Sequence, residues 1–327
     1  MTMNLLITTR GSLLHKKGES FLIKTPEKNT EVPITKVESI WIATAVMLST
    51  DVIKSALEHN IDIVFLDEFG DPMGRVWHPK LGSTTLIRRR QLEVAEDEKG
   101  LQLVKEWEVQ KTGNQIALLK KLKKTRPGQE IPLETAISEI SALRDDALHL
   151  SGNINHCRQA ILGIEGMASR IYFSAIAEIL PDEWTFTERS RRPAKDSFNA
   201  TLNYGYGVLY SIVERACILS GLDPYVGILH TDNYNKKSFV FDFIEGFRIH
   251  IDEPVVFLFT KRKVHEGHFE PFEGGVGLSK EGKALLMNEL NAHFDKEAAY
   301  RGKNMKIRNT ILAEAHALAN QLVRGYD

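Results

Sequence analysis

The sequence HPKLGSTTLIRRRQ, residues 78–91, separates two parts of the chain that differ in hydrophobic pattern. Pro79 and Gly82 interrupt regular structure and are typical of a linker. Before them, short runs rich in β-branched and aromatic residues alternate with turn formers; after them, apolar residues recur at helical spacing. We therefore predict an α+β protein, with an N-terminal β-sandwich-like domain at residues 1–80 and a larger all-α domain at residues 81–327.

The first part is predicted to contain four strands and one short helix. The strands are expected at Asn4–Thr8, Ser20–Lys24, Ser39–Ile42 and Ile61–Leu66. Thr50 is expected to cap a helix at Asp51–His59, because a hydroxyl at the cap position accepts a hydrogen bond from the first helical turn.

The second part is predicted to be helical. Helices are expected at Leu101–Leu122, over most of Ile131–Ile179, and from Asp196 to about Ser220. Asp196 is a good N-terminal cap and Gly221 a good terminator, while Gly152 and Gly163 are weak points of the second helical region.

Composition narrows the class of protein without defining it. Hydrophobic residues make up 43% and charged residues 26%, and 42 basic against 43 acidic side chains give a net charge of -1. Any binding of nucleic acid must therefore depend on a local basic patch. The two cysteines, Cys157 and Cys217, fit reduced core thiols. With no signal-peptide pattern and no apolar run long enough to cross a bilayer, we expect a cytoplasmic protein.

Glu165 is the first candidate for chemistry. On a helix over Gly163–Leu180 it shares a face with apolar residues, whereas Glu178 points the other way. A buried carboxylate is costly unless it is paired, protonated or bound to a metal. Two interpretations remain: a metal ligand, or a buried salt bridge to an arginine such as Arg158.

His230 and two further acids complete the candidate set. His230 ends the apolar run GLDPYVGILH, residues 221–230, in which Asp223 and Pro224 predict the start of a short helix. In SFVFDFIEGFR, residues 238–248, we favour a helix over a strand, which places Asp242 and Glu245 on the same side. A single histidine is usually structural, but this set of oxygen ligands with one nitrogen suits Mg²⁺ or Mn²⁺.

A basic turn lies between these segments, in TERSRRPAKDSFNATLNYGYG, residues 187–207. Arg189, Arg191, Arg192 and Lys195 flank a proline directly before a predicted helix N-terminus. Such a turn could clamp phosphates. A solvated basic loop is the alternative.

In this order, four segments resemble the universal integrase of CRISPR adaptation. The segments are Glu165-Gly166 with the helix that follows, Arg191-Arg192-Pro193 through Tyr206, Gly221–His230, and Asp242–Arg248. The resemblance covers nearly the whole chain. One departure is Ile249, where a proline often follows the third motif in the family.

The resemblance implies a β-sandwich domain that mediates homodimerisation and a helical catalytic domain. It also implies metal ligation by Glu165, His230 and Glu245, with Asp242 as a nearby catalytic acid. Relatives carry Asp or Glu at the last ligand. The residues that the resemblance implies for DNA binding are Arg191, Arg192, Lys195, Asn199 and Arg248.

The expected function is that of a metal-dependent DNA endonuclease/integrase. It would insert captured DNA fragments into a CRISPR array as new spacers, by attack of a DNA 3′-OH on a phosphodiester. The expected partners are the DNA fragment and the repeat, a second copy of the chain and a small ferredoxin-like protein, in a prokaryotic cytoplasm with no membrane. The alternatives are a stand-alone hydrolytic nuclease for branched or single-stranded DNA and a DNA-binding scaffold without chemistry.

Overall fold

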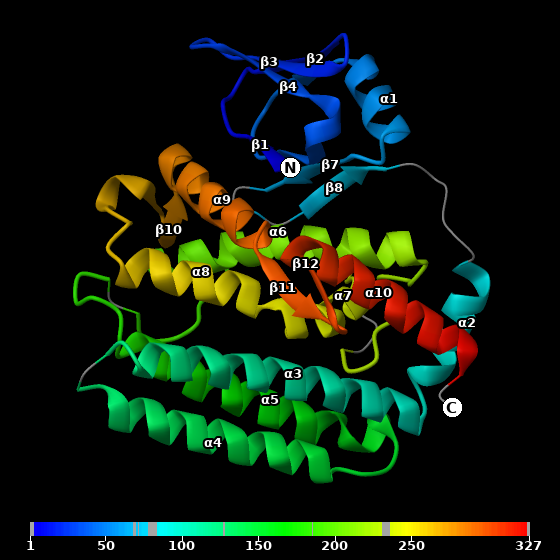
Figure 1. Cartoon of the computed structure of the whole chain (residues 1–327). Helices are drawn as coiled ribbons and strands as arrows, with labels where there is room; N and C mark the ends of the chain where they lie inside the picture. Colours follow the sequence, from blue (N-terminus) through cyan, green and yellow to red (C-terminus); the bar gives the residue numbers. More distant parts are fainter. Residues whose placement is uncertain are drawn as a thin grey trace. The chain divides into compact units, whose positions relative to one another are not determined.

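The computed structural model describes residues 3–67, 70, 72–77, 84–126, 128–184, 186–230 and 236–325. Strands dominate the N-terminal region and helices the rest, which confirms the predicted α+β class (Figure 1). The predicted linker at His78–Ser83 lies outside the described residues.

The N-terminal strands form two four-stranded sheets, with the orders β1-β5-β7-β8 and β4-β3-β2-β6. Their bounds are β1 (Met3–Ile7), β2 (Leu13–Lys17), β3 (Ser20–Lys24), β4 (Asn29–Pro33), β5 (Val37–Ile42), β6 (Met47–Leu48), β7 (Asp62–Leu66) and β8 (Pro72–Val76). The four predicted strands correspond to β1, β3, β5 and β7, with ends within two residues of prediction.

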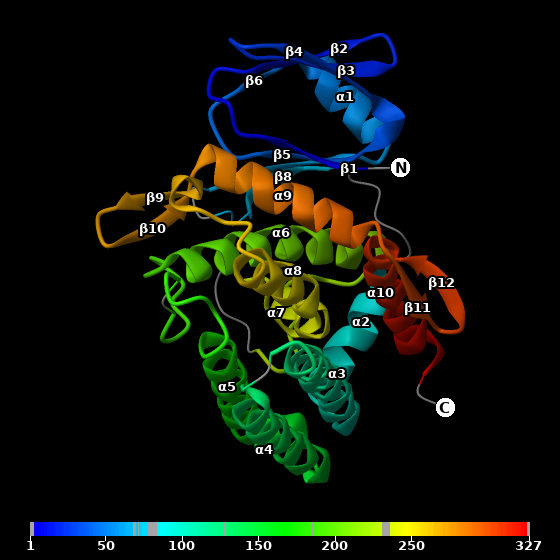
Figure 2. The same cartoon turned by 60° about the vertical axis from the view of Figure 1, so that its left-hand side comes forward.

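One apolar core joins the two sheets. Side chains from both, including Leu14 and Ile40, pack with Val52 and Ala56 of α1 (Thr50–Glu58), and Figure 2 shows the two sheets as separate layers. Complete burial of one large apolar side chain of this kind stabilises the folded state by about 1.5–3 kcal/mol. The predicted cap was wrong by one residue, because Ser49 holds the cap position and Thr50 is already helical.

Three long helices pack side by side in the helical region: α3 (Glu98–Lys123), α4 (Glu130–His149) and α5 (Ile154–Ala177) (Figure 1). Gly152 separates α4 from α5 with a φ of 104°, a conformation that glycine adopts without strain. Gly163 lies inside α5 and does not interrupt it.

The remaining elements follow α5 or precede α3. They are α2 (Thr84–Val94), α6 (Ser197–Ser220), α7 (Ser238–Phe243), the 3-10 helix η2 (Glu245–Phe247), α8 (Ile249–Thr260), η3 (Glu266–His268), β9 (Phe269–Phe272), β10 (Gly275–Leu278), α9 (Lys280–Phe294), β11 (Glu297–Tyr300), β12 (Lys303–Lys306) and α10 (Ile307–Arg324). A further 3-10 helix, η1 (Ile34–Lys36), precedes β5. The two hairpins, β9–β10 and β11–β12, were not predicted.

Both predicted ends of α6 are confirmed. The Asp196 Oδ1 atom accepts a hydrogen bond from the Asn199 N–H at 2.7 Å, as a capping residue does. Gly221 follows the last helical residue with a φ of 86°.

The chain divides into two compact units, neither of which is one continuous segment. One contains Met1–Lys80, Arg191–Ser211 and Val264–His293; the other contains Leu81–Ser190, Ile212–Lys263 and Phe294–Asp327. The second unit contains the candidate chemistry of Glu165, His230 and Glu245.

Of the helices in the described ranges, α5 alone has the length and apolar composition of a possible membrane span. It packs against α3 and α4, and Ile161, Tyr172 and Ile176 are fully buried. Over its most apolar 18 residues as a whole, 28% is buried.

Candidate active site

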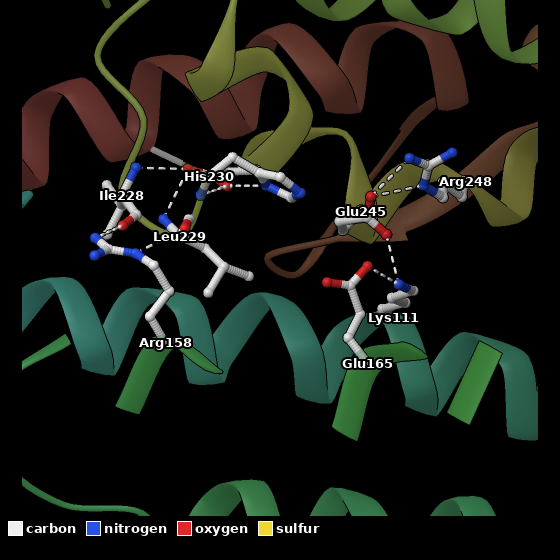
Figure 3. A network of polar contacts seen from close by, with 9 residues as sticks. Lys111, Arg158, Glu165, Ile228, Leu229, His230, Glu245 and Arg248 are labelled. Carbon is white, nitrogen blue, oxygen red and sulfur yellow. Dashed lines mark hydrogen bonds and ion pairs between the residues drawn. The ribbon is translucent and has the colours of Figure 1, made fainter. Parts of the chain in front are cut away.

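Lys111 joins two of the predicted acids. Its Nζ atom lies 2.7 Å from Glu165 Oε1 on α5 and 2.7 Å from Glu245 Oε2 on η2 (Figure 3). The Lys111 side chain is only 5% exposed, so these ion pairs are shielded from water. Arg158 was the alternative predicted partner of Glu165, and in the structure Lys111 takes that place.

The burial of Lys111 follows from the spacing of residues along α3. Leu101, Val104, Leu119 and Leu122 form its buried apolar face, and the same helical face carries Glu108, Lys111, Thr112 and Gln115 between them. A polar stretch in the middle of a buried face is costly unless partners are supplied.

Aromatic packing and hydrogen bonds hold Glu245 beside α3. Phe239 and Phe243 of α7 lie edge-on to Trp107 of α3, with ring centroids 6.0 and 6.1 Å apart. The Asn114 Nδ2 atom donates to the Gly246 carbonyl at 2.9 Å. A Cβ at Gly246 would lie 2.6 Å from the end of the flexible Gln110 side chain, which would have to move.

Arg248 and Lys111 together keep Glu245 ionised. The Nε and Nη2 atoms of Arg248 lie 2.8 and 2.7 Å from Glu245 Oε1, while Lys111 takes the other oxygen. Burial raises the pKa of Glu245, but Arg248 and then Lys111 outweigh burial and lower this pKa to about 2. Burial lowers the pKa of Lys111, yet Glu245 and Glu165 raise it above its ordinary value, so Lys111 stays charged.

Glu108 is a third carboxyl group near Lys111, and it was not among the predicted site residues. Burial raises its pKa to about 8; the charge of Lys111 opposes that rise, and Glu165 and Glu245 add to it. Its Oε1 atom has no hydrogen-bond partner among the described residues. Glu108 is therefore protonated at neutral pH.

Asp242 organises the loop that carries His230. Its Oδ2 atom accepts the N–H groups of Ile228 and Leu229 at 2.6 and 3.0 Å, and its Oδ1 atom accepts the N–H of His230 at 3.0 Å. From the other side, Arg158 donates to the carbonyls of Leu229 and Ile228 at 2.9 and 3.0 Å (Figure 3).

Asp242 also orients the His230 ring. Because a carboxylate only accepts, we assign the proton to Nδ1, which lies 2.6 Å from Asp242 Oδ1; Nε2 is then the nitrogen left for a ligand. Burial lowers the pKa of His230, but Asp242, with smaller contributions from Glu165 and Glu245, raises it overall. Burial raises the pKa of Asp242, although the bonds from His230 and the backbone offset part of that rise.

The predicted short helix before His230 was wrong. Residues 221–230 form turns, in which the Asp223 side chain accepts the Tyr225 N–H at 2.9 Å. The N–H groups at the end of the segment bond to Asp242 instead of to a helical turn. A side chain at Gly227 would lie 2.2 Å from the His230 carbonyl oxygen, so this turn needs glycine.

The structure brings together some of the predicted ligands. Glu165 and Glu245 share Lys111, and in Figure 3 the His230 ring extends toward Glu245. As placed, no three His, Cys, Asp or Glu side chains among the described residues are grouped closely enough to hold a metal ion. Metal ligation by this set stays a prediction.

The predicted DNA-binding residues lie in different environments. Arg191, Arg192 and Lys195 are exposed, with Arg192 3.6 Å from Asp67 and Lys195 donating to the Gly274 carbonyl at 3.0 Å. Asn199 is fully buried and donates to Asp196 Oδ2 at 2.6 Å. Arg248 forms an ion pair with Glu245.

The N-terminal region contains two sheets, and the helical region holds Glu165 and Glu245 around Lys111. The protein therefore belongs to the class of α+β proteins with a charged site in a helical region. The family model described as CRISPR associated protein Cas1 matches residues 5–292. A CRISPR-associated endonuclease Cas1 from Archaeoglobus fulgidus is 35% identical over 312 residues, which cover 91% of this chain and 90% of that protein. The chain belongs to the Cas1 family.

Solved structures share the fold. A Cas1 protein from Thermotoga maritima is 25% identical, with a TM-score of 0.81, and the alignment covers 98% of this chain and 97% of that one. A casposase bound to its integration product is 24% identical, with a TM-score of 0.85 and coverage of 99% and 91%.

Proposed function

We propose that this protein is a metal-dependent DNA endonuclease and integrase of CRISPR spacer acquisition. The observation that carries the proposal is the pair of the partly buried Glu165 and the buried Glu245, which share one cation, with the oriented His230 on the same unit. Membership of the Cas1 family, in which the Archaeoglobus fulgidus relative is named an endonuclease, supports it.

The donor set fits Mg²⁺ or Mn²⁺. Glu165 and Glu245 would supply oxygens and His230 would supply Nε2, and hard divalent ions favour oxygen-rich sets of this kind. The Lys111 ammonium lies 2.7 Å from an oxygen of each carboxylate, which supports a cation position between them. When bound, the ion supplies Lewis-acid stabilisation of the charge that develops on the reacting phosphate.

The residues of the chain itself position the site. Asp242 keeps the His230 proton on Nδ1 and fixes the loop, and Arg248 balances the charge of Glu245. Arg191, Arg192 and Lys195 would contact DNA phosphates, which position a duplex without reading its sequence.

The reaction is proposed to be strand transfer. The 3′-OH of a captured fragment attacks a phosphodiester of the repeat border, a new phosphodiester forms, and the repeat strand leaves with its own 3′-OH. One ester replaces another, so no external energy source is required. Positioning of the two DNA segments supplies a large share of the rate.

The test uses a labelled fragment, a supercoiled target with leader and repeat, Mn²⁺ and the small ferredoxin-like partner. Label should become covalently joined to the target when the fragment ends in 3′-OH, but not when it ends in 3′-deoxy. Equal target cleavage with both fragments and no joined product would support the hydrolytic nuclease instead.

A matched pair of variants ties the reaction to the site. Glu165→Gln should abolish joining, whereas Glu178→Gln, at the exposed C-cap position of the same helix, should not change it. DNA binding without any chemistry in the unaltered protein would favour a scaffold.

The proposed partners are testable separately. We propose homodimerisation through the N-terminal sandwich and a larger complex with the ferredoxin-like protein, in the prokaryotic cytoplasm. Light scattering of the chain alone and mixed with that partner measures both assemblies.

A further inference from the structure

We infer that Lys111 is a built-in occupant of the ion position. Its ammonium group holds Glu165 and Glu245 together in the metal-free protein and must leave the space between them before a divalent ion binds. The inference rests on the proposed function, because it concerns the same two carboxylates.

The geometry of Lys111 is that of a bridging cation. Its Nζ atom lies 2.7 Å from an oxygen of each carboxylate, and the two acids come from different elements, α5 and η2. A divalent ion bound to both carboxylates would need oxygens at roughly 2.0–2.6 Å. The ammonium therefore fills the space that such an ion would need.

Charge balance argues against both cations staying in place. The cluster now has two carboxylates, Glu165 and Glu245, balanced by Lys111 and Arg248. A divalent ion added to these four groups would give them a net charge of +2, which the neighbouring Asp242 carboxylate offsets only in part, and incompletely paired buried charge is unfavourable.

Lys111 is better suited to move than Arg248. Arg248 uses two nitrogens on one oxygen of Glu245, a fixed fork geometry, whereas Lys111 is a single charge on a flexible stem. The ammonium can swing aside while it keeps its proton, and a DNA phosphate arriving with the ion offers it a new partner.

Two consequences follow for the metal-free protein. Without Lys111, the facing carboxylates would repel each other and the fold would lose stability. The same carboxylates would bind a divalent ion more tightly, because no resident cation competes for them.

The experiment compares Lys111→Met with the unaltered protein and with Lys120→Met, an exposed lysine on the same helix. Mn²⁺ alone is titrated by calorimetry without DNA, and thermal unfolding is followed with Mn²⁺ and with a chelator. Lys111→Met should bind Mn²⁺ about tenfold more tightly or better, equivalent to about 1.4 kcal/mol. Its Tm should fall in chelator and rise more on addition of Mn²⁺ than the Tm of the unaltered protein, whereas Lys120→Met should match the unaltered protein.

The failures can be told apart. Equal or weaker Mn²⁺ affinity in a folded Lys111→Met protein overturns the role of Lys111 and leaves the proposed function standing. Absence of Mn²⁺ binding in both proteins overturns the proposed function.

A second variant tests the inference in case Lys111→Met fails to fold. If Lys111→Met does not fold in chelator, the double variant Lys111→Met/Glu165→Gln removes one charge of each sign and should regain folding. A double variant no more stable than the single one overturns the inference, because balancing the carboxylates is then not what Lys111 does.

Discussion

Glu108 makes the stability of the protein depend on pH. Its pKa in the folded protein is raised to about 8, mainly by burial, above the ordinary value of 4.5. Because the folded protein favours the protonated form, Glu108 contributes to the free energy of unfolding. This contribution is complete below pH 4.5 and is lost as the pH rises through 8. The free energy of unfolding should therefore fall across that range.

Glu108→Gln tests this at a single residue. The amide imitates the protonated acid, so the variant should lack this fall in stability, with a difference on the order of 5 kcal/mol at high pH. Urea unfolding at a series of pH values measures it. Glu106→Gln, at an exposed position on the same helix, should retain the pH dependence of the unaltered protein.

Asp242 should matter more for its hydrogen bonds than for its volume. Asp242→Ala leaves the N–H groups of Ile228, Leu229 and His230 without their acceptor. At about 1–3 kcal/mol for each unsatisfied buried group, we expect a loss of at least about 3 kcal/mol by urea unfolding.

The conservative variant Asp242→Asn separates the loss of these hydrogen bonds from the effect of the Asp242 charge on the His230 ring. Asp242→Asn keeps an acceptor oxygen and should cost less stability. It removes the charge that raises the pKa of His230, so the pKa of this ring, followed by NMR, should fall. An unchanged His230 pKa would contradict the assigned contact.

At the scale of elements, two glycines should respond oppositely to alanine. A Cβ at Gly227 would lie 2.2 Å from the His230 carbonyl oxygen and 2.6 Å from the Ser238 Cβ atom, so Gly227→Ala should destabilise by about 1–3 kcal/mol. A Cβ at Gly163, inside α5, meets nothing within 4 Å. Gly163→Ala should stabilise by about 0.5–1 kcal/mol, because alanine favours the helix. Thermal unfolding of both variants decides the comparison.

The elements also show which patterns in the sequence were informative. Strands such as β3 and the two ends of α6 were predictable because alternation, caps and terminating glycines are local features. The segment 221–230 was not predictable as turns, because Asp242, a dozen positions later, takes its N–H groups. The hairpins β9–β10 and β11–β12 are short and lack a strong alternating pattern.

The site was partly predictable for the same reason. Glu165 could be recognised as an acid on an apolar face, and Asp242 as an acid on the same side of a helix as Glu245. Lys111 and Glu108 were missed, although their helical spacing from Leu101, Val104 and Leu119 already placed them on the buried face of α3. Which acid meets which cation depends on helix packing, which the sequence pattern does not encode.

At the scale of the whole molecule, near-neutral charge makes DNA binding depend on local groups. Arg191→Ala and Arg192→Ala should each weaken binding to all DNA sequences alike and flatten the slope of log affinity against log salt by about 0.7–0.9. Fluorescence anisotropy at several salt concentrations measures this. Lys24→Ala, at an exposed position on β3, serves as the control, and an unchanged slope in the arginine variants would make the basic turn a solvated loop.

The division of the chain into interleaved units limits how the protein can be recombined. The chain passes from one unit to the other after residues 80, 190, 211, 263 and 293, and one of these crossings falls inside α6. A chimera that exchanges only residues 1–80 between relatives would thus transplant an incomplete module and separate it from Arg191–Ser211 and Val264–His293, the segments that complete it. Functional chimeras should instead require all three segments from one parent. Sequence changes in any one segment should therefore limit which changes the other two can accept.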